Sequence, residues 1–352
     1  MAKKILFLHT ELAGYFLACV NKLVSSYSTE VHIVKFPVNK EAPFVFSNDN
    51  GVDFYDRNEY SAKELIDLSK KISPDFIFCA GWIDKSYLKI CKYFFGKIPT
   101  MIVLDNHWKG TLKQQLATLV APYYLQNKFS HIWIPGLFQY EYARRLGFKK
   151  ENILTGMYSA DVEKFHVYYQ QYKALKQQHF PKRFLYVGRY IQMKGVKELW
   201  EAFIEIQKEN NNEWELWCAG TGELESQFPV HSKIKNFGFV QPSDIETLIK
   251  DAGVIILPSH YEPWGVVVHE FAACGMPIIC SNEVGASNTF LIDGYNGYQY
   301  ESGNKEALKT VMKRMMTCND FALQEMSLRS IELSNTINPL IWATKIWELI
   351  RK

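Results

Sequence analysis

Short apolar runs rich in β-branched and aromatic residues alternate with helical patterns along nearly the whole chain, and this alternation is the strongest constraint on the fold. Strands that alternate with helices pair in parallel, and the helices then cover both faces of the sheet. The sequence therefore predicts an α/β protein with doubly wound sheets. The expected strands are 4–9, 30–36, 75–81, 100–105, 131–135, 183–188, 213–220, 235–240, 253–258 and 277–281. The expected helices lie near 12–26, 61–72, 84–95, 111–126, 138–146, 195–209, 243–251, 265–274 and 304–317.

The alternation runs once through the first half and then restarts. A chain of 352 residues also exceeds the usual size of one hydrophobic core. We therefore expect two Rossmann-like domains that face each other across a cleft, with ligands at the carboxyl ends of the strands. The predicted domains are 1–158 and 159–338, and a final amphipathic helix, 339–352, is expected to be separate or to pack back on the first domain. The polar segment 156–182 is interpreted as an irregular connection.

Composition and charge exclude several classes of protein. The apolar run after Lys3 and Lys4 is too short for a secretory signal, and no later run is long enough to span a bilayer. The seven cysteines are scattered without a C-x-x-C pair, which favours reduced thiols and no zinc site. We therefore expect a cytoplasmic protein.

Residues 1–160 carry 20 basic and 14 acidic side chains. This surplus suggests an anionic partner or a peripheral contact with the inner membrane face, although plain solvated surface explains it too. No nucleic-acid module is recognisable.

Arg189 and Lys194 follow the predicted strand 183–188 in the sequence VGRYIQMKG. They are expected at a strand-to-helix turn, where the free N–H groups and the dipole of a helix attract anions. Two cations at this place are suited to a diphosphate. Ordinary surface cations remain the alternative for this pair taken alone.

Glu262 and Glu270 stand eight positions apart in HYEPWGVVVHEFAACGMP, residues 260–277. Carboxylates are costly to bury without a partner, so an apolar segment that contains two of them needs an explanation. Pro263 and Gly265 mark the start of a helix, which places Glu262 in a loop and Glu270 in the helix. A loop carboxylate can accept hydrogen bonds from sugar hydroxyls, and the deeper one can accept them from a ribose diol. The free N–H groups around Trp264, Gly265, Val266 and Val267 would face a phosphate.

The stretch EPWGVVVHE resembles the E-x7-E motif of family 4 retaining glycosyltransferases, which have the two-domain GT-B fold. VGRYIQMKG, CAGTGELE, the GFV of 238–240 and the run ACGMPIICSNEVGASNTFLIDGYNGY are similar to further family motifs in the expected order. YSADVEKF, residues 158–165, resembles the family's interdomain segment. The resemblance is strong over 156–300 and covers the first half only by topology.

The resemblance implies a hexosyltransferase that moves a sugar from a nucleotide-diphosphate-sugar donor to an acceptor hydroxyl with retained configuration. It implies a glycan or lipid-linked acceptor and a setting in bacterial surface polysaccharide or lipopolysaccharide synthesis. Domain 1–158 would bind the acceptor and domain 159–338 the donor. Arg189 and Lys194 would stabilise the departing diphosphate, while Glu262 would bind the donor sugar. The other implied donor-binding residues are Glu270 for the ribose, Val240 for the base, and Gly14, Gly188, Trp264, Gly265, Val266 and Val267.

The first half offers fewer candidates. His107 in VLDNHWKG resembles the family's cleft histidine, although a histidine at a strand end is often structural. The family has a glycine pair after its first strand, where this chain has HTELAGYF and only Gly14 is available. Leu112, Leu116, Leu119 and Tyr123 form a helical stripe beside lysines. This stripe could rest on a membrane, but docking on its own sheet is the favoured interpretation.

Other functions fit parts of the pattern. Paired carboxylates also serve glycosidases, and a nucleotide-sugar epimerase shares the two-domain architecture. A non-catalytic nucleotide-sugar binding module is the third alternative. The chain has no D-x-D triplet, so we expect activity without a metal and without any cofactor beyond the donor.

Overall fold

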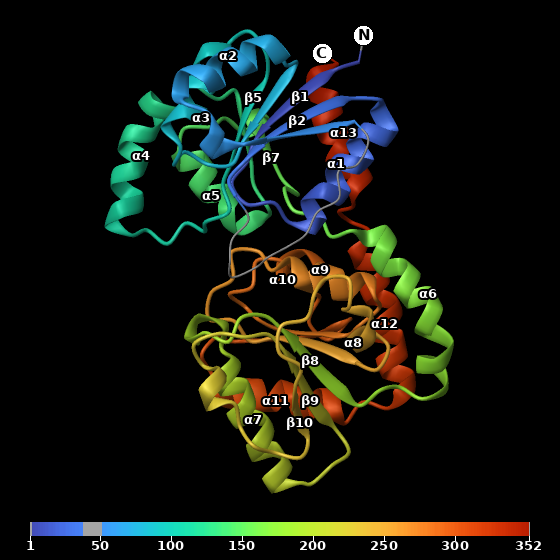
Figure 1. Cartoon of the computed structure of the whole chain (residues 1–352). Helices are drawn as coiled ribbons and strands as arrows, with labels where there is room; N and C mark the ends of the chain where they lie inside the picture. Colours follow the sequence, from blue (N-terminus) through green and yellow to red (C-terminus); the bar gives the residue numbers. More distant parts are fainter. Residues whose placement is uncertain (1, 38–50, 352) are drawn as a thin grey trace. The chain divides into compact units, whose positions relative to one another are not determined.

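The computed structural model describes residues 2–37 and 51–351 and divides the chain into two compact units. Unit 1 is Met1–Ala160 with Ile337–Lys352, and unit 2 is Asp161–Thr336. Each unit has its own sheet with helices on both faces (Figure 1). The predicted doubly wound α/β fold is thus confirmed for each unit. The predicted cleft between the units, and the acceptor and donor roles of the two domains, stay predictions.

The sheet of unit 1 has the strand order β3-β2-β1-β4-β5-β6-β7, and every neighbouring pair is parallel. Apart from Lys4 at the start of β1, its central strands β1 and β4 are apolar and buried, as a sheet covered on both faces requires. The strands are β1 (Lys4–Leu8), β2 (Glu30–Lys35), β3 (Val52–Asp56), β4 (Phe76–Cys79), β5 (Thr100–Val103), β6 (His131–Trp133) and β7 (Ile153–Leu154).

One face of this sheet is covered by four helices and the other by two. The helices are α2 (Ala62–Ile72), α3 (Lys85–Phe94), α4 (Leu112–Leu125) and α5 (Leu137–Arg145) on one face, and α1 (Gly14–Tyr27) with α13 (Pro339–Ile350) on the other. The last helix of the chain therefore packs in unit 1, where Trp342 stacks on Trp133 with ring centroids 5.1 Å apart. The hydroxyls of Tyr27 and Thr344 also share a hydrogen bond of 2.7 Å.

Unit 2 has a sheet with the order β10-β9-β8-β11-β12-β13, again parallel throughout. Its strands are β8 (Arg183–Val187), β9 (Glu215–Ala219), β10 (Ile234–Asn236), β11 (Val254–Leu257), β12 (Ile278–Ser281) and β13 (Gly297–Tyr300). Its helices are α6 (Val162–Gln178), α7 (Val196–Glu209), α8 (Glu246–Ile249), α9 (Val266–Ala273), α10 (Ser287–Phe290), α11 (Lys305–Met316) and α12 (Asp320–Ser334). Helix α7 packs against α11, and α9 packs against both α6 and α12.

Side-chain caps define the starts of several helices. Ser61 and Glu64 form a reciprocal capping box on α2, and the Asp84 carboxylate accepts from the amides of Ser86 and Tyr87 at the start of α3. Asn338 accepts from the amide of Ile341, with Pro339 as the first helical residue of α13. Each cap satisfies backbone donors that the helix itself leaves free, which is why these boundaries could be anticipated from sequence.

Each sheet reverses its direction of growth once. In unit 1 the reversal lies between β1 and β4, and in unit 2 between β8 and β11. The loops that follow such a pair of strands diverge to opposite faces of the sheet, which leaves a crevice at the carboxyl ends of the strands. The positions of these two reversals decide which loops can form a binding site in each unit.

Two expectations about local structure are wrong. Residues 156–182 are not an irregular connection, because most of them form the 17-residue helix α6. Only Val162 and Phe165 of this helix are fully buried, so its sequence lacks the apolar stripe that predicts a helix. The stripe of Leu112, Leu116, Leu119 and Tyr123 does not dock on the sheet: all four side chains are exposed, and α4 packs through Ala121 and Leu125 instead.

Candidate functional site

The loops after β8 and β11 are joined at the strand reversal of unit 2. The amide of His260, in the loop after β11, donates to the carbonyl of Met193, in the loop after β8 (2.9 Å). Gly195 has a positive φ of 65°, and a Cβ there would lie 2.2 Å from the carbonyl oxygen of Pro258. Only glycine allows this approach at this backbone angle, so the two loops form one surface.

Lys194 and Glu262 form an ion pair across these two loops. Each side chain is only 15% exposed, so the pair is partly shielded from water. The backbone of Glu262 is fixed by a parallel bridge to the loop after β12: its amide donates to the Glu283 carbonyl (3.2 Å), and its carbonyl accepts from the amide of Gly285 (3.0 Å). A cation and a carboxylate are thus held together on rigid backbone at the carboxyl ends of three strands.

Arg189 belongs to the same cluster. The Tyr186 hydroxyl donates to the Arg189 carbonyl (2.8 Å), and the guanidinium side chain is exposed. Burial raises the pKa of Tyr186 well above its usual range, the charge of Glu262 raises it further, and the charge of Arg189 lowers it. Both charged groups therefore act on one tyrosine hydroxyl. The structure brings together Arg189, Lys194 and Glu262, three of the four charged residues predicted for the donor.

Glu270 lies on α9 and has different neighbours. Burial raises the pKa of its carboxyl group to about 7, while the charge of Lys164 lowers it and that of Asp161 raises it. Lys164 belongs to the first turn of α6, where its Nζ donates to the Pro242 carbonyl (3.1 Å). Lys164 was not predicted as a site residue, although it lies within the segment YSADVEKF that resembles the interdomain motif.

The other donor residues predicted in unit 2 follow its strands or begin α9. Gly188 and Val240 follow β8 and β10, and Gly265 caps α9 with a positive φ of 90°. Trp264 is 3% exposed, and its indole Nε1 is buried without a hydrogen-bond partner. Val266 and Val267 begin α9 and are partly buried. Their placement is compatible with donor binding, and their roles stay predictions.

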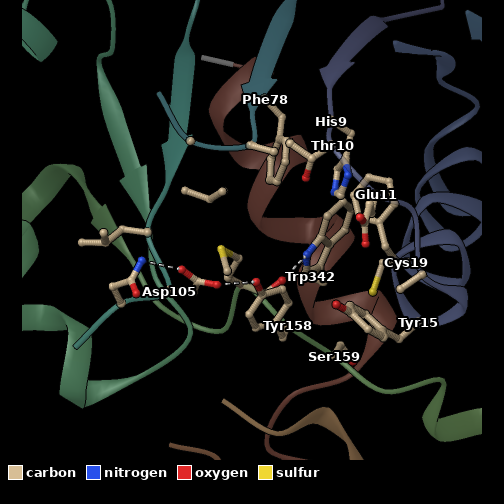
Figure 2. A pocket seen from close by; sticks show the side chains of 18 of the residues that line it. His9, Thr10, Glu11, Tyr15, Cys19, Phe78, Asp105, Tyr158, Ser159 and Trp342 are labelled. Atoms are coloured by element: carbon tan, nitrogen blue, oxygen red, sulfur yellow. Dashed lines mark hydrogen bonds between the residues drawn. The ribbon is translucent and has the colours of Figure 1, made fainter. Parts of the chain in front are cut away.

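Unit 1 contains a cavity of about 300 Å³ at its own strand reversal (Figure 2). The segments that line it follow β1, β4 and β5, which are the strands on either side of the reversal, and residues 157–159 and Trp342 complete it. Phe16, Phe78 and Trp342 provide aromatic walls. The volume is of the size that small-molecule sites have, and rings of this kind can pack against the apolar faces of a sugar.

Polar groups converge on this cavity. The hydroxyl of Tyr158 donates to the Asp105 carboxylate at 3.4 Å, as Figure 2 shows. His9 stands at the end of β1, and its Nδ1 is buried without a hydrogen-bond partner. Burial lowers the pKa of His9 to about 4, although a hydrogen bond with the backbone of Glu11 raises it in part. The imidazole is therefore largely neutral at pH 7.

His9, Asp105 and Tyr158 were not predicted from the sequence, in which His107 and Gly14 were the candidates of the first half. His107 is 6% exposed and packs edge-on against Phe138, with ring centroids 4.7 Å apart, and it is not among the residues that line the cavity. Gly14 is the exposed first residue of α1, and a Cβ there would have no neighbour within 4 Å. Polar residues directly after two central strands were the available signal for His9 and Asp105.

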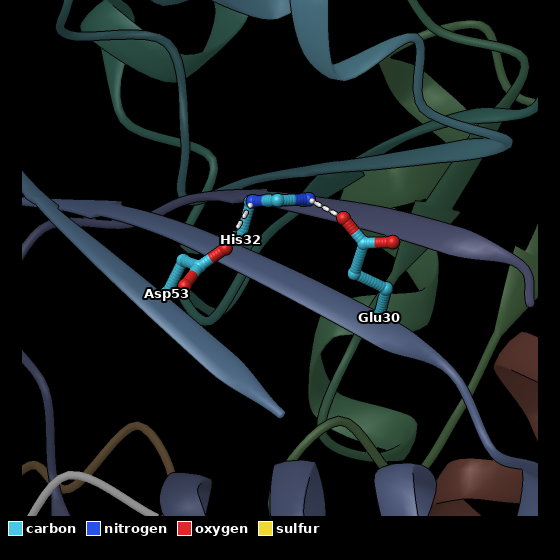
Figure 3. Close-up of side chains that lie close together, drawn as sticks. All are labelled: Glu30, His32 and Asp53. Atoms are coloured by element: carbon cyan, nitrogen blue, oxygen red, sulfur yellow. Dashed lines mark hydrogen bonds and ion pairs between the residues drawn. The ribbon is translucent and has the colours of Figure 1, made fainter. Parts of the chain in front are cut away.

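Glu30, His32 and Asp53 form the group whose donor atoms could hold a metal ion within the described ranges 2–37 and 51–351. Figure 3 shows the imidazole between the two carboxylates: Nε2 is 3.0 Å from Glu30 and Nδ1 is 3.2 Å from Asp53. One ion cannot bind both nitrogens of a ring, and Nδ1 also lies 3.2 Å from the Tyr55 hydroxyl. The arrangement is that of a hydrogen-bonded cluster that joins β2 to β3.

Comparison with known proteins adds a family to this geometry. Residues 170–330 match the family model described as glycosyl transferases group 1. An uncharacterized glycosyltransferase of Methanocaldococcus jannaschii is 30% identical over 39% of this chain and 36% of its own length. A capsular polysaccharide biosynthesis glycosyltransferase, CapM of Staphylococcus aureus, is 29% identical over 40% of this chain and 37% of its own length. The chain thus spans little more than a third of the curated relatives it matches.

A solved structure covers both units. Anabaena HepE, in complex with UDP and glucose, superposes with a TM-score of 0.74 over 100% of each chain at 14% identity. This likeness concerns the fold and extends over both halves of the chain. Within the described ranges, no helix is both long enough and apolar enough to span a bilayer. The chain therefore has the two-domain GT-B fold, and its residues 170–330 are similar to the group 1 glycosyl transferases.

Proposed function

We propose that this protein is a retaining glycosyltransferase that transfers a hexose from a nucleoside-diphosphate sugar to an acceptor hydroxyl. The observation that carries the proposal is the ion pair of Lys194 and Glu262 beside Arg189, at the strand reversal of the unit that matches the group 1 family. Cations at this position suit a diphosphate, and a carboxylate beside them suits sugar hydroxyls.

The ion pair has a consequence for donor binding. Lys194 and Glu262 neutralise each other in this structure. A bound diphosphate would draw the ammonium group away, and the sugar hydroxyls would then donate to the freed carboxylate. Lys194 and Arg189 would stabilise the charge that develops on the leaving diphosphate, an effect for which one fixed donor can contribute about 3 kcal/mol.

The aromatic cavity of unit 1 is proposed as the acceptor site. Its walls suit a sugar ring, and Asp105 and Tyr158 line it with oxygen atoms that can form hydrogen bonds with hydroxyl groups. The similarity to a capsular polysaccharide glycosyltransferase supports a glycan or lipid-linked acceptor in surface polysaccharide synthesis. No metal is proposed as part of the site, because the chain lacks a D-x-D triplet.

The test is a screen of nucleoside-diphosphate sugars, first by thermal shift and then by release of the nucleoside diphosphate. Binding raises apparent stability by mass action, so the donor is found without knowledge of the acceptor. Transfer requires that release of the diphosphate depends on an added acceptor and that the product keeps the anomeric configuration, with full activity in excess chelator. An isomerised donor without any acceptor would indicate an epimerase, and donor binding without turnover over a broad acceptor panel would indicate a binding module.

A further inference from the structure

Helix α4 presents its large apolar side chains to solvent. Leu112 is 78% exposed, Leu116 64%, Leu119 70%, Val120 61% and Tyr123 83%. These residues recur at spacings of three and four and therefore share one face of the helix. The buried residues of this helix are Ala121 and Leu125.

This orientation is the reverse of what burial of apolar surface favours. A helix on the surface of a globular domain directs its widest apolar stripe toward the core. Single exposed leucines are common and need no explanation, but a contiguous apolar face marks an interaction site. Helix α4 lies at the edge of unit 1, beside α3 and α5 (Figure 1).

Lysines lie near both ends of this helix, and acidic residues are rare in the sequence around it. Residues 85–140 contain seven lysines and one acidic residue, Asp105, which lines the cavity described above. Lys109 and Lys113 are exposed at the start of α4. Beyond its end, the Lys128 Nζ lies 3.9 Å from the Tyr124 ring centroid. Burial lowers the pKa of Lys128, and the positive charge of Lys92 on α3 lowers it further, which places two cations at this end.

The end of α3 extends the surface with the same chemistry. The ring of Tyr93, 43% exposed, has the Lys97 Nζ 3.8 Å and the Lys70 Nζ 5.0 Å from its centroid. Phe95 and Lys97 line a shallow hollow together with Gln126, so the ends of α3 and α4 are neighbours. Exposed aromatic rings beside lysines are typical of the boundary between lipid headgroups and acyl chains.

We propose that α4, together with the end of α3, docks on the surface of an anionic lipid bilayer. The helix lies in the plane of the interface with its leucines in the acyl boundary and the exposed Lys109 and Lys113 among the headgroups. Its 14 residues span about 21 Å, which is too short to cross a hydrocarbon core of about 30 Å.

The charge pattern favours lipid over a second copy of the chain. Pairing of two α4 helices would bring lysines of one copy against lysines of the other, because cations lie at both ends of the helix and no acidic residue lies within it. An anionic bilayer complements the leucines and the lysines at once. Docking requires neither donor nor acceptor and does not rest on the proposed transfer reaction.

The test is flotation of the full chain with vesicles, without nucleotide. We expect binding to vesicles of phosphatidylcholine mixed equally with phosphatidylglycerol and little binding to phosphatidylcholine alone. The double substitution Leu116→Gln with Leu119→Gln should lower the partition coefficient by about tenfold or more. Lys113→Gln should lower it by about fivefold, and ionic strength of about 1 M should reduce the difference between the two lipids.

The matched control is Val167→Gln with Leu328→Gln, which alters two exposed apolar residues of α6 and α12. This control should bind the vesicles like the unmodified chain. The proposal is overturned if the chain does not bind anionic vesicles, or if the α4 and control variants bind equally well. It is also overturned if light scattering shows a dimer that the α4 substitutions dissociate while lipid binding stays absent.

Discussion

Lys194 and Glu262 pair across two loops that are 68 residues apart in the chain and adjacent at the strand reversal of unit 2. Their strands, β8 and β11, are neighbours in the sheet although two other strands separate them in sequence. Neither residue could form this pair without the closure of the whole α/β unit. The ion pair can therefore form only when the candidate donor site is assembled.

Replacement of Lys194 by alanine should lower kcat by about 100-fold or more, because a fixed cation aimed at the leaving diphosphate is lost. It should also weaken binding of the nucleoside diphosphate product, measured by calorimetry. Lys197→Ala is the matched control, since Lys197 is an exposed lysine three residues further along. Equal kcat values for the two variants, with both folded by circular dichroism, would remove Lys194 from the proposed mechanism.

The ionisation of Glu270 should make donor binding depend on pH. Its pKa of about 7 in the structure means that the carboxyl group is largely protonated at pH 6 and largely ionised at pH 8. Ribose hydroxyls donate to the ionised form, so binding lowers this pKa, and affinity for the nucleoside diphosphate should rise by up to about tenfold from pH 6 to pH 8.

Glu270→Gln supplies the control for this pH dependence. The diphosphate itself also gains charge in this range, and that contribution is common to both proteins. The ratio of the two affinities, measured by calorimetry at each pH, gives the contribution of the Glu270 carboxyl group to the pH dependence of binding. A ratio that stays constant from pH 6 to pH 8 would contradict the assignment of Glu270 to the donor.

Gly195→Ala should disrupt the candidate donor site. The new Cβ would lie 2.2 Å from the Pro258 carbonyl oxygen, at a φ of 65° that costs an L-residue about 1–2 kcal/mol. The loop must move, and the hydrogen bond from His260 to Met193 moves with it. We expect loss of nucleotide binding in a thermal-shift assay.

Gly294→Ala is the matched control: its φ is 74°, but no atom lies within 4 Å of the new Cβ. Nucleotide binding that survives in both variants would contradict the proposed tight approach.

His9 should make the stability of unit 1 depend on pH below neutrality. Its pKa is about 4 in the folded protein and 6.5 in the unfolded chain, so the unfolded state binds more protons between these values. The resulting contribution to the free energy of unfolding, up to about 3 kcal/mol, is complete above pH 6.5 and is lost as the pH falls toward 4.

Chemical denaturation of the chain and of His9→Gln at several pH values tests this contribution. The difference in unfolding free energy between the two proteins should shrink as the pH falls from about 6.5 to 4, because only the histidine takes up a proton there. Carboxyl groups titrate alike in both proteins and cancel in the difference. A difference that does not vary with pH would show that His9 is not kept neutral by burial.

Much of the fold could be predicted from local features of the sequence. The alternation of apolar runs and helical patterns indicated parallel sheets, since periodicity and strand composition are local properties. Pro263 and Gly265 marked the start of α9, and they correctly placed Glu262 in a loop and Glu270 on a helix. Helix α6 was not predicted because few of its side chains are buried. A periodic apolar pattern arises where one face of a helix is buried, so a largely exposed helix lacks this pattern in its sequence.

The sequence by itself determined the alternation of strands and helices, the α/β class and the charged residues that follow β8 and β11. Only the tertiary structure decided that Lys194 pairs with Glu262, that His9 and Asp105 line one cavity, and that α4 turns its leucines outward. The physical reason is that a contact between distant residues depends on strand order and loop closure, which no local pattern encodes. The sequence of a helix shows that it has an apolar face, whereas the fold decides whether that face meets the core or the solvent.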